Sequence, residues 1–226
     1  MSDKRVVVTG VGAVTPIRNT VADFWSALVA GVCGAAPIVK FDTEKHKVKF
    51  ACEIKGYDAL AHFNPKDARK LPAFIQHAIV SARDAWADCG VDLEAIDLDR
   101  AGSIVGSGIG GLLTIEEQHK VLQKRGPRRI SPYFVPKIMM NAAAGQISIS
   151  YGLRGSNFAT ASACATATHA LGMAFRLIRE GDIDFAVTGG SEAVITPLCM
   201  AGFCSLKALS TSYNDTPEKA SRPFDK

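Results

Sequence analysis

Short apolar runs that are typical of buried strands alternate along this chain with longer stretches of helical periodicity. Such alternation is typical of α/β folds, in which helices cover the faces of a largely parallel sheet. The strand-like runs occupy residues 5–9, 101–106, 157–163 and 184–188. The sequence therefore predicts a layered α/β fold with a buried, largely parallel sheet.

Helical patterns lie between these runs. The first begins after Thr20, a good N-cap residue, and ends at Gly31. The second predicts one long helix from Lys66 to Cys89, followed by Gly90 and packed on the sheet. Three further helices are expected at residues 112–123, 135–151 and 166–180, and a loop at 126–136.

Composition excludes several classes of protein. The chain has 226 residues, 47% of them hydrophobic, which is enough apolar mass for one or two ordinary domains. Its apolar runs are far shorter than the roughly 20 residues that cross a bilayer. The net charge of +4 is scattered, so we expect neither a membrane nor a nucleic-acid partner. The six cysteines show no CxxC pair, which predicts reduced thiols in the cytoplasm and no zinc site.

A glycine motif from Gly106 to Gly111 follows a predicted strand and precedes a predicted helix, as GxGxxG does in dinucleotide-binding proteins. The dinucleotide motif also needs an acidic residue about 20 positions later. Here that region is Gly126-Pro-Arg-Arg-Ile-Ser131. We therefore interpret these glycines as a tight strand-to-helix turn and not as a dinucleotide site.

The segment from Asn157 to Gly172 carries the strongest chemical signal. A strand of small and β-capable residues leads into Cys164, and a helix rich in small residues begins at once. This is the pattern of a nucleophile elbow, in which small neighbours leave room for a substrate. A helix N-terminus stabilises a thiolate, and its N–H groups can accept an oxyanion. The pattern therefore predicts that Cys164 attacks a thioester carbonyl.

The alternative is that Cys164 is a small buried hydrophobe, as most free cysteines are. We assign that role to the other five, which are Cys33, Cys52, Cys89, Cys199 and Cys204. His169 would lie about 140° around the helix from Cys164, so we expect it to be structural. No other histidine is placed in sequence to complete a pair with the thiol. The residues alone thus predict an activated thiol without its base.

The β-ketoacyl-acyl-carrier-protein synthases have an active-cysteine region that resembles Ser162-Ala-Cys-Ala-Thr-Ala-Thr-His-Ala-Leu-Gly172, followed by Val187-Thr-Gly-Gly-Ser-Glu192. The resemblance covers the whole chain and is nearest to the type II, long-chain enzymes, because Gly108-Ile109-Gly110 matches their acyl-pocket loop. Cysteine in place of glutamine at position 164 argues against a noncatalytic chain-length-factor relative. Arg18 departs from the family's usual glycine, which would cost about 1 kcal/mol if its turn needs a positive φ.

The resemblance implies roles for residues beyond Cys164. The acyl pocket would be formed by Gly108, Ile109, Phe134 and Ala163. Phe134 would reach into the other subunit of a homodimer. The acidic acyl carrier protein would dock on Lys66, Arg69, Lys70 and Lys207, for which the alternative is a solvated surface. No metal or other cofactor is implied, because the substrates arrive on the carrier's phosphopantetheine.

The implied activity is that of an acyltransferase of fatty-acid elongation. It joins an acyl thioester to malonyl-carrier by decarboxylative Claisen condensation, with Cys164 carrying the acyl group. The implied fold is a thiolase-like layered sandwich of two similar βαβαβαβ halves, of which residues 1–226 would form the amino-terminal one. We expect the carboxy-terminal half, with its assisting histidines and lysine, to be absent, and this chain alone to complete no condensation.

Two other functions stay open at this point. The chain could be half of a polyketide ketosynthase, which shares the elbow and differs in its pocket and partners. It could also be a noncatalytic piece that docks the carrier protein or dimerises without turnover.

Overall fold

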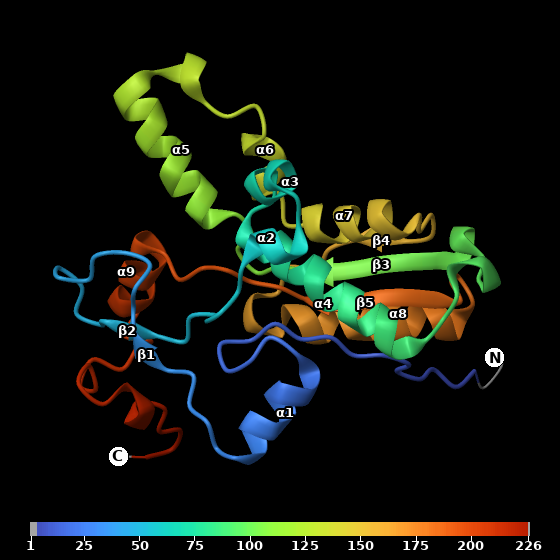
Figure 1. Cartoon of the computed structure of the whole chain (residues 1–226), viewed down its shortest axis with the longest axis horizontal. Coiled ribbons are helices and arrows are strands. Elements are labelled where there is room, and N and C mark those ends of the chain that lie inside the picture. Colours follow the sequence, from blue (N-terminus) through green and yellow to red (C-terminus); the bar gives the residue numbers. More distant parts are fainter. Residues whose placement is uncertain (1–3, 226) are drawn as a thin grey trace. The chain divides into compact units, whose positions relative to one another are not determined.

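The computed structural model describes residues 4–225, which divide between two compact units. The first unit takes in the segment up to Ala13 and residues Asp58–Ala193. The second takes in Val14–Tyr57 and the chain from Val194 onward. Figure 1 labels the helices and strands of both.

A three-stranded parallel sheet is the centre of the first unit. Its strands are β3 (Ala101–Gly106), β4 (Asn157–Phe158) and β5 (Phe185–Gly190), in the order β4-β3-β5. Ser103 is in register with Asn157, and Gly106 with Gly190. The last residues of β3 and β5 therefore lie side by side, and the chain leaves both strands at the same edge of the sheet.

The helices of the first unit connect and cover these strands. They are α2 (Ala59–His62), α3 (Pro65–Lys70), α4 (Ala73–Cys89), α5 (Leu112–Arg125), α6 (Phe134–Ile138), α7 (Ala142–Tyr151) and α8 (Thr166–Glu180). Short 3-10 turns lie at Leu93–Ala95 (η1), Leu98–Arg100 (η2), Pro127–Arg129 (η3) and Ala163–Ala165 (η4). In the described part of the chain, no helix is long and apolar enough to cross a bilayer.

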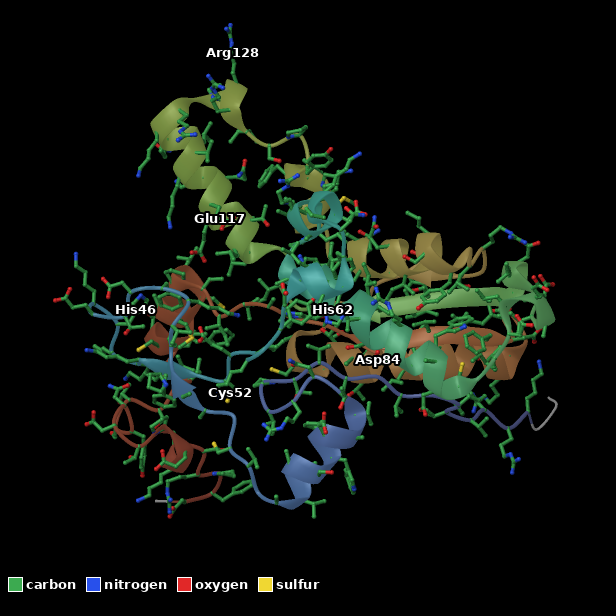
Figure 2. All side chains as sticks on the ribbon, in the orientation of Figure 1. His46, Cys52, His62, Asp84, Glu117 and Arg128 are labelled. Atoms are coloured by element: carbon green, nitrogen blue, oxygen red, sulfur yellow. The ribbon has the colours of Figure 1, made fainter. Side chains whose placement is uncertain are left out.

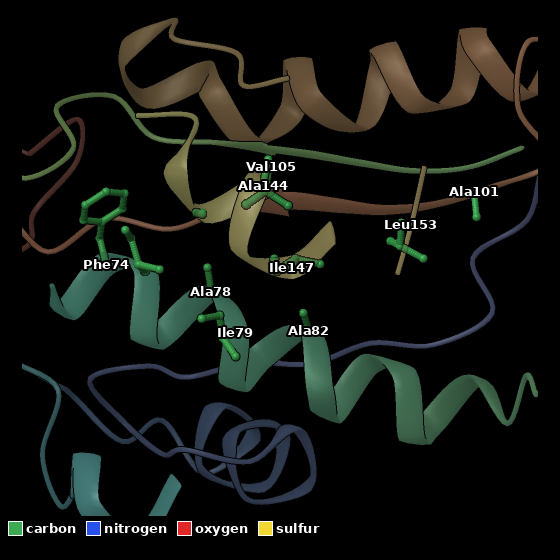
Figure 3. Close-up of a cluster of buried hydrophobic side chains, with 11 residues drawn as sticks. Phe74, Ala78, Ile79, Ala82, Ala101, Val105, Ala144, Ile147 and Leu153 are labelled. Atoms are coloured by element: carbon green, nitrogen blue, oxygen red, sulfur yellow. The ribbon is translucent and has the colours of Figure 1, made fainter. Parts of the chain in front are cut away.

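Both faces of β3 are buried, which gives the unit its layers. Ala101 and Val105 face one core, together with α4 and α7, whereas Ile104 faces a second core with Ala170 and Ala174 of α8. Figure 3 shows α8 on one side of the sheet and α7, then α4, on the other. This arrangement confirms the predicted α/β fold with a buried parallel sheet.

The second unit is smaller and contains the remaining elements. These are α1 (Val21–Val29), β1 (Ala36–Pro37), β2 (Phe50–Ala51), α9 (Pro197–Ser205) and the 3-10 turn η5 (Pro217–Lys219). β1 and β2 pair antiparallel, and Ile38, Val48 and Met200 form the buried core. Thr20 caps α1 as predicted, because its side chain accepts a hydrogen bond from the Asp23 amide.

Two predicted helices are each divided in two, so those predictions were wrong. The helix expected from Lys66 to Cys89 breaks at Pro72, which disfavours helical backbone in the residue before it. The helix expected over 135–151 breaks after Ile138, where the chain bends around the Gly110–Gly111 turn. A Cβ at Gly111 would lie 2.1 Å from the Lys137 carbonyl oxygen, so the two backbones are in close contact there.

Two strand predictions also need correction. Residues 5–9 pair with no strand in the described structure, because the chain that follows them runs along α4 instead. A Cβ at Gly12 would lie 1.9 Å from the Ser81 carbonyl oxygen, and the Val11 amide donates to Asp88 at 2.9 Å. The strand expected over 157–163 ends at Phe158, because the following residues turn into α8.

Arg18 adopts no positive φ, so the cost considered for it does not arise. Its turn closes through the Thr15 hydroxyl, which accepts from the Arg18 amide at 3.1 Å.

Candidate active site

Cys164 is the middle residue of η4, directly before α8, and it is exposed. The residue before it, Ala163, has a φ of 51°, a left-handed conformation that residues with a Cβ rarely adopt. The chain thus makes a sharp, strained turn and presents the thiol at the start of the helix. This is the elbow geometry that the sequence predicts. The exposure of Cys164 argues against the alternative that it is a small buried hydrophobe.

Hydrogen bonds hold this turn from both sides. The Thr166 hydroxyl accepts from the Ser162 amide at 2.8 Å, and the Thr160 hydroxyl donates to the Thr166 carbonyl oxygen at 2.9 Å. The Ala165 amide donates to the Ser162 carbonyl oxygen at 3.1 Å. Residues before and after Cys164 are therefore bonded to each other, which supports the strained backbone between them.

Glycines at the ends of β3 and β5 let α8 lie close to the sheet. A Cβ at Gly106 would lie 2.4 Å from the Thr166 Cγ2 atom and 2.5 Å from the Thr160 hydroxyl. A Cβ at Gly190 would lie 2.8 Å from the Cβ of Ala167. Because real Cβ atoms essentially never approach other atoms below 3.0 Å, only glycine fits at either position without a shift.

The loop after β3 is bonded to the carboxylate of Glu192, which follows β5. Its Oε2 accepts from the amides of Gly108 at 2.7 Å and Ile109 at 3.1 Å. Its Oε1 accepts from the Ser107 hydroxyl at 2.9 Å and the Gly110 amide at 3.2 Å. The backbone donors of the glycine motif are thus occupied by a carboxylate of the same chain, and in this conformation they are not free to bind a pyrophosphate.

Three of the predicted acyl-pocket residues lie at or beside the elbow, and the fourth, Phe134, is expected to act in the other subunit. Gly108 lies against the elbow, because its Cβ would be 3.4 Å from the Ala163 carbonyl oxygen. Ile109 follows it in the same loop and is 38% exposed. Phe134 is the first residue of α6, whereas α6 contacts the loop through its last residues, near Ile138. The structure thus groups Gly108, Ile109 and Ala163 within this chain, while the expectation that Phe134 reaches into the other subunit stays a prediction.

His169 lies on α8 and is exposed. It lines an open hollow of about 510 Å³, which is bounded by Thr160–Ser162 and by Thr168, Gly172, Met173 and Arg176 of α8. Cys164 does not line this hollow. Within the described residues, no side chain hydrogen-bonds to the Cys164 thiol, and no group of His, Cys, Asp or Glu could hold a metal ion. The site presents a thiol at a helix start, without a base beside it.

The predicted docking residues divide between the two units. Lys66, Arg69 and Lys70 lie on α3 of the first unit, and Lys207 lies in the second. Around α3, the Lys137 ammonium donates to the Arg69 carbonyl oxygen at 2.6 Å, and the Lys70 Nζ atom lies 5.4 Å from the centre of the Tyr133 ring. α3 therefore presents a basic surface that contacts Lys137 of α6 and Tyr133, the residue before α6.

Two of the other cysteines were predicted wrongly. Cys33 and Cys52 are exposed, because they lie just outside the short β1–β2 pair and not within a core. Figure 2 labels Cys52. Partial burial raises the pKa of the Cys52 thiol, and the neighbouring Cys33 raises it further. These two thiols are the natural comparison for Cys164 in any labelling experiment.

Glu192 is the site residue that sequence reasoning missed. Its partners lie 82 to 85 residues earlier in the chain, so no local pattern connects them. The available signal was its place directly after a strand that ends in two glycines, next to a second glycine-rich strand end.

Comparison with known proteins agrees with this site. A family model described as the N-terminal domain of beta-ketoacyl synthase matches residues 3–226. A 3-oxoacyl-[acyl-carrier-protein] synthase 2 from Vibrio cholerae is 48% identical over 226 residues, which are 100% of this chain and 54% of that protein. The chain thus spans about half the length of the curated relatives it matches.

Solved structures show the same fold. A beta-ketoacyl synthase from Burkholderia phymatum has a TM-score of 0.86 and 28% identity, over 98% of this chain and 54% of that one. The ketosynthase complex of a type II polyketide acyl-carrier protein has a TM-score of 0.76 and 27% identity, over 88% of this chain and 54% of that one. The fold is therefore that of the thiolase-like α/β half, and the chain belongs to the beta-ketoacyl synthase family, whose N-terminal domain it carries.

Proposed function

We propose that this chain forms the acyl-accepting half of a 3-oxoacyl-acyl-carrier-protein synthase, an acyltransferase that elongates fatty acids. The observation that carries the proposal is the exposed Cys164 at a strained turn directly before α8. A nucleophile in that position is open to substrate and lies at the positive end of a helix dipole.

The first step would be a thioester exchange at Cys164. Its thiolate attacks the carbonyl carbon of the incoming acyl thioester, a new C–S bond forms, and the carrier thiolate leaves and takes up a proton. The tetrahedral oxyanion needs hydrogen-bond donors. The Ala165 amide already donates to Ser162, and we assign the Cys164 amide, at the same helix start, as a donor to the oxyanion.

The second step would use the bound acyl group. A malonyl thioester loses carbon dioxide, its carbanion attacks the acyl carbonyl, and the Cys164 thiolate is released as the carbon–carbon bond forms. This chain supplies the nucleophile and the loop from Ser107 to Gly110. The groups that assist decarboxylation would come from outside residues 1–226. No metal or other cofactor of the protein takes part in this scheme.

An acyl carrier protein would bring both substrates. A ketosynthase of similar structure is known in complex with its acyl-carrier protein, and α3 offers basic side chains to an acidic partner. Lys66, Arg69 and Lys70 are the residues we assign to this contact, with Lys207 as a further one. We also infer a homodimer that works in the cytoplasm, where thiols stay reduced.

The identities favour fatty-acid elongation over polyketide synthesis. The curated relatives named 3-oxoacyl-[acyl-carrier-protein] synthase 2 are 44% to 48% identical to this chain. The polyketide ketosynthase complex is 27% identical. We therefore assign fatty acyl chains, and not polyketide intermediates, as the group that Cys164 accepts.

Intact-mass spectrometry tests the proposal. The chain is incubated with a long-chain saturated acyl-carrier thioester, and the gain in mass is followed with time. We expect one acyl group per chain in the wild type and in Cys33→Ala, and none in Cys164→Ala. Lys66→Glu combined with Arg69→Glu should slow transfer from the carrier and leave transfer from a small acyl thioester unchanged. Acylation that survives in Cys164→Ala would refute the proposal.

A further inference from the structure

The exposed carboxylate of Glu192 accepts hydrogen bonds from four donors of one loop. Both of its oxygens are used, and they accept from three successive backbone amides and one hydroxyl. Three successive N–H groups that converge on one point form an anion-binding nest. Glu192 therefore does for this loop what a bound anion does in other proteins.

The position of Glu192 is itself fixed by the residue before it. The Ser191 amide donates to the Gly106 carbonyl oxygen at 3.1 Å, and the Ser191 hydroxyl donates to the Phe74 carbonyl oxygen at 2.7 Å. Ser191 is thus tied to β3 on one side and to α4 on the other. The residue before Glu192 is thus bonded to two elements, and the carboxylate projects from it toward the glycine-rich loop.

The chemistry at this point requires a carboxylate. A carboxylate offers two acceptor oxygens, whereas the amide of glutamine offers one acceptor and adds an NH₂ donor. In a Glu192→Gln chain, that NH₂ group would face the donors of either Gly108 and Ile109 or Ser107 and Gly110. Hydrogen bonds to a charged acceptor are also stronger than neutral ones. Glutamine would therefore keep the shape of the side chain and release part of the loop.

The loop that Glu192 holds adjoins the elbow. A Cβ on Gly108 would lie 2.9 Å from the Glu192 Oε2 atom and 3.4 Å from the Ala163 carbonyl oxygen. Gly108 is thus packed between the carboxylate and the residue that precedes Cys164. Any outward movement of the loop would change the space beside the thiol, and it would carry Ile109 with it.

We propose that Glu192 is a positioning residue of the acyl-accepting site. Its carboxylate fixes the loop from Ser107 to Gly110 against the elbow and so defines the wall along which an acyl chain lies beside Cys164. This inference rests on the proposed acyl transfer to Cys164 and on the acyl-pocket role that the resemblance implies for Gly108 and Ile109. If Glu192 acts in this way, its substitution should slow the transfer of long acyl chains to Cys164 and leave the reaction of a small reagent with the thiol unchanged.

The test compares three reactions at Cys164 in the full chain. These are alkylation by iodoacetamide, acylation by an acetyl thioester and acylation by a decanoyl thioester of N-acetylcysteamine. For Glu192→Gln we expect decanoyl transfer to fall by roughly tenfold relative to acetyl transfer, because bonds to a charged acceptor are lost. Iodoacetamide alkylation should stay as in the wild type. Glu117→Gln on α5 is the matched control and should change none of the three rates.

Hydrogen exchange supplies a second readout. Exchange at the amides of Gly108, Ile109 and Gly110 should rise in Glu192→Gln, while the amides of β3 and α8 keep their protection. Faster exchange with an unchanged ratio of decanoyl to acetyl transfer would overturn the proposal and leave Glu192 a structural residue. If Glu192→Gln fails to fold, Ser107→Ala removes one donor, and it should shift the same ratio in the same direction.

The two proposals fail in different ways. A wild-type chain that no thioester acylates would refute the proposed function and this inference together. Normal discrimination between acyl chains in Glu192→Gln, with a wild type that is acylated at Cys164, would refute this inference alone.

Discussion

Ala163 is the residue on which the geometry of the site depends. It has a Cβ and yet adopts a φ of 51°, so its backbone is strained directly before the nucleophile. Backbone strain of this kind persists only where surrounding contacts hold the conformation in place. Here the hydrogen bonds among Thr160, Ser162 and Thr166 hold it. The strain and its support are local in sequence, which is why the turn at Cys164 could be predicted from the sequence.

Two substitutions at Ala163 test whether its backbone is strained, because glycine tolerates a positive φ and valine does not. Ala163→Gly relieves the left-handed penalty, so the free energy of unfolding should stay level or rise by up to about 1 kcal/mol. Ala163→Val places a β-branched side chain at a positive φ and should lower it by roughly 1 to 3 kcal/mol. Urea unfolding followed by circular dichroism measures both. Equal stability of the glycine and valine variants would contradict the strained turn.

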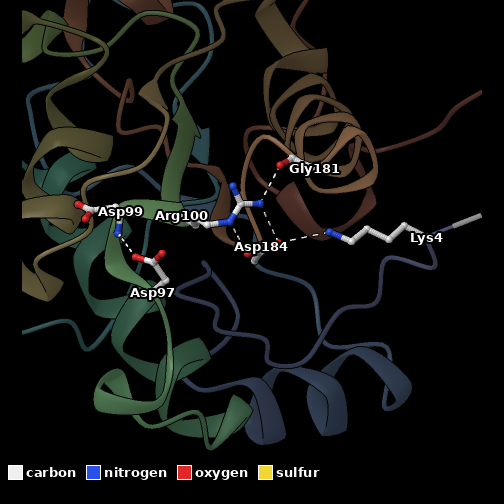
Figure 4. A network of polar contacts seen from close by, with 6 residues as sticks. All are labelled: Lys4, Asp97, Asp99, Arg100, Gly181 and Asp184. Carbon is white, nitrogen blue, oxygen red and sulfur yellow. Dashed lines mark hydrogen bonds and ion pairs between the residues drawn. The ribbon is translucent and has the colours of Figure 1, made fainter. Parts of the chain in front are cut away.

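Asp184 lies at the other end of β5 from the site, in an ion-pair network. It accepts from the Arg100 guanidinium, which also donates to the Gly181 carbonyl oxygen at 2.7 Å, and from Lys4 at 3.3 Å (Figure 4). The hydrogen bond from Arg100 holds the pKa of the Asp184 carboxyl at about 2, below its usual range. Lys4 acts in the same direction.

The network should make stability depend on pH in the acid range. Because the pKa is lower in the folded chain, the contribution of Asp184 is complete above its unfolded value of about 4. It is lost as the pH falls from there through about 2. Asp184→Asn should therefore lower the urea midpoint at pH 6 and have much less effect near pH 2. Glu180→Gln, at the exposed end of α8, is the control and should show no such difference.

At the scale of elements, the site depends on how closely α8 approaches the ends of β3 and β5. Gly106 and Gly190 provide that approach, with Thr166 and Ala167 on the helix side. The ends of α8 were predictable, because a small-residue pattern begins at Thr166 and Gly181 closes the helix with a φ of 89°. The close contact with β3 was not predictable, because it joins residues about sixty positions apart in the chain.

Two glycine substitutions should have opposite effects on stability. Gly106→Ala would place a Cβ 2.6 Å from the Thr160 carbonyl oxygen, and we expect it to lower the free energy of unfolding by roughly 1 to 3 kcal/mol. Gly145→Ala in α7 meets no atom within 4 Å and should raise it by about 0.5 to 1 kcal/mol. Chemical unfolding of both variants is the measurement. A stabilised Gly106→Ala would show that α8 does not approach β3 so closely.

The errors in the predicted elements have local physical causes. The break between α3 and α4 was marked in the sequence by Pro72, whereas the break after α6 depends on a distant glycine turn that packs on the Lys137 carbonyl. The segment from Arg5 to Thr9 has the composition of a strand, but composition does not supply a neighbouring strand to pair with. Periodicity thus predicted which segments are regular, and tertiary contacts decided where they end.

At the scale of the whole molecule, apolar side chains of α8 are exposed within the described residues. On α8, Leu171 is 48% exposed, Phe175 43% and Met173 37%, while Ala170 and Ala174 on the other side of the helix are buried. Exposed apolar patches of this kind mark surfaces that bind other protein or promote aggregation. The same surface borders the hollow beside His169.

We therefore expect the chain to self-associate through α8. Sedimentation velocity should show the mean mass rising with concentration. Leu171→Lys combined with Phe175→Lys should reduce that rise, because it places charge on the patch. Val39→Lys, at a residue of the second unit that is 84% exposed, is the control and should leave the association unchanged. A wild type that stays monomeric at every concentration would contradict the expectation.

The family resemblance carried more of the functional site than the local patterns did. The elbow at Cys164 followed from residues close together in sequence, whereas the pocket residues and the basic surface came from the resemblance. The structure places Gly108 against Ala163, while the role expected for Phe134 in the other subunit stays a prediction. Neither source gave Glu192 a role, although the resemblance includes the segment that ends at it, because that role exists only where two parallel strands end side by side.

Peptide mapping of the acyl adduct tests whether Cys164 is the residue that accepts the acyl group. The chain is treated with a long-chain acyl-carrier thioester or with cerulenin, digested and analysed by mass spectrometry, beside Cys164→Ala. We expect the adduct to lie on Cys164, to be absent from the variant, and not to appear on the exposed Cys33 and Cys52. An adduct spread over the exposed cysteines, or one that persists in Cys164→Ala, would contradict it.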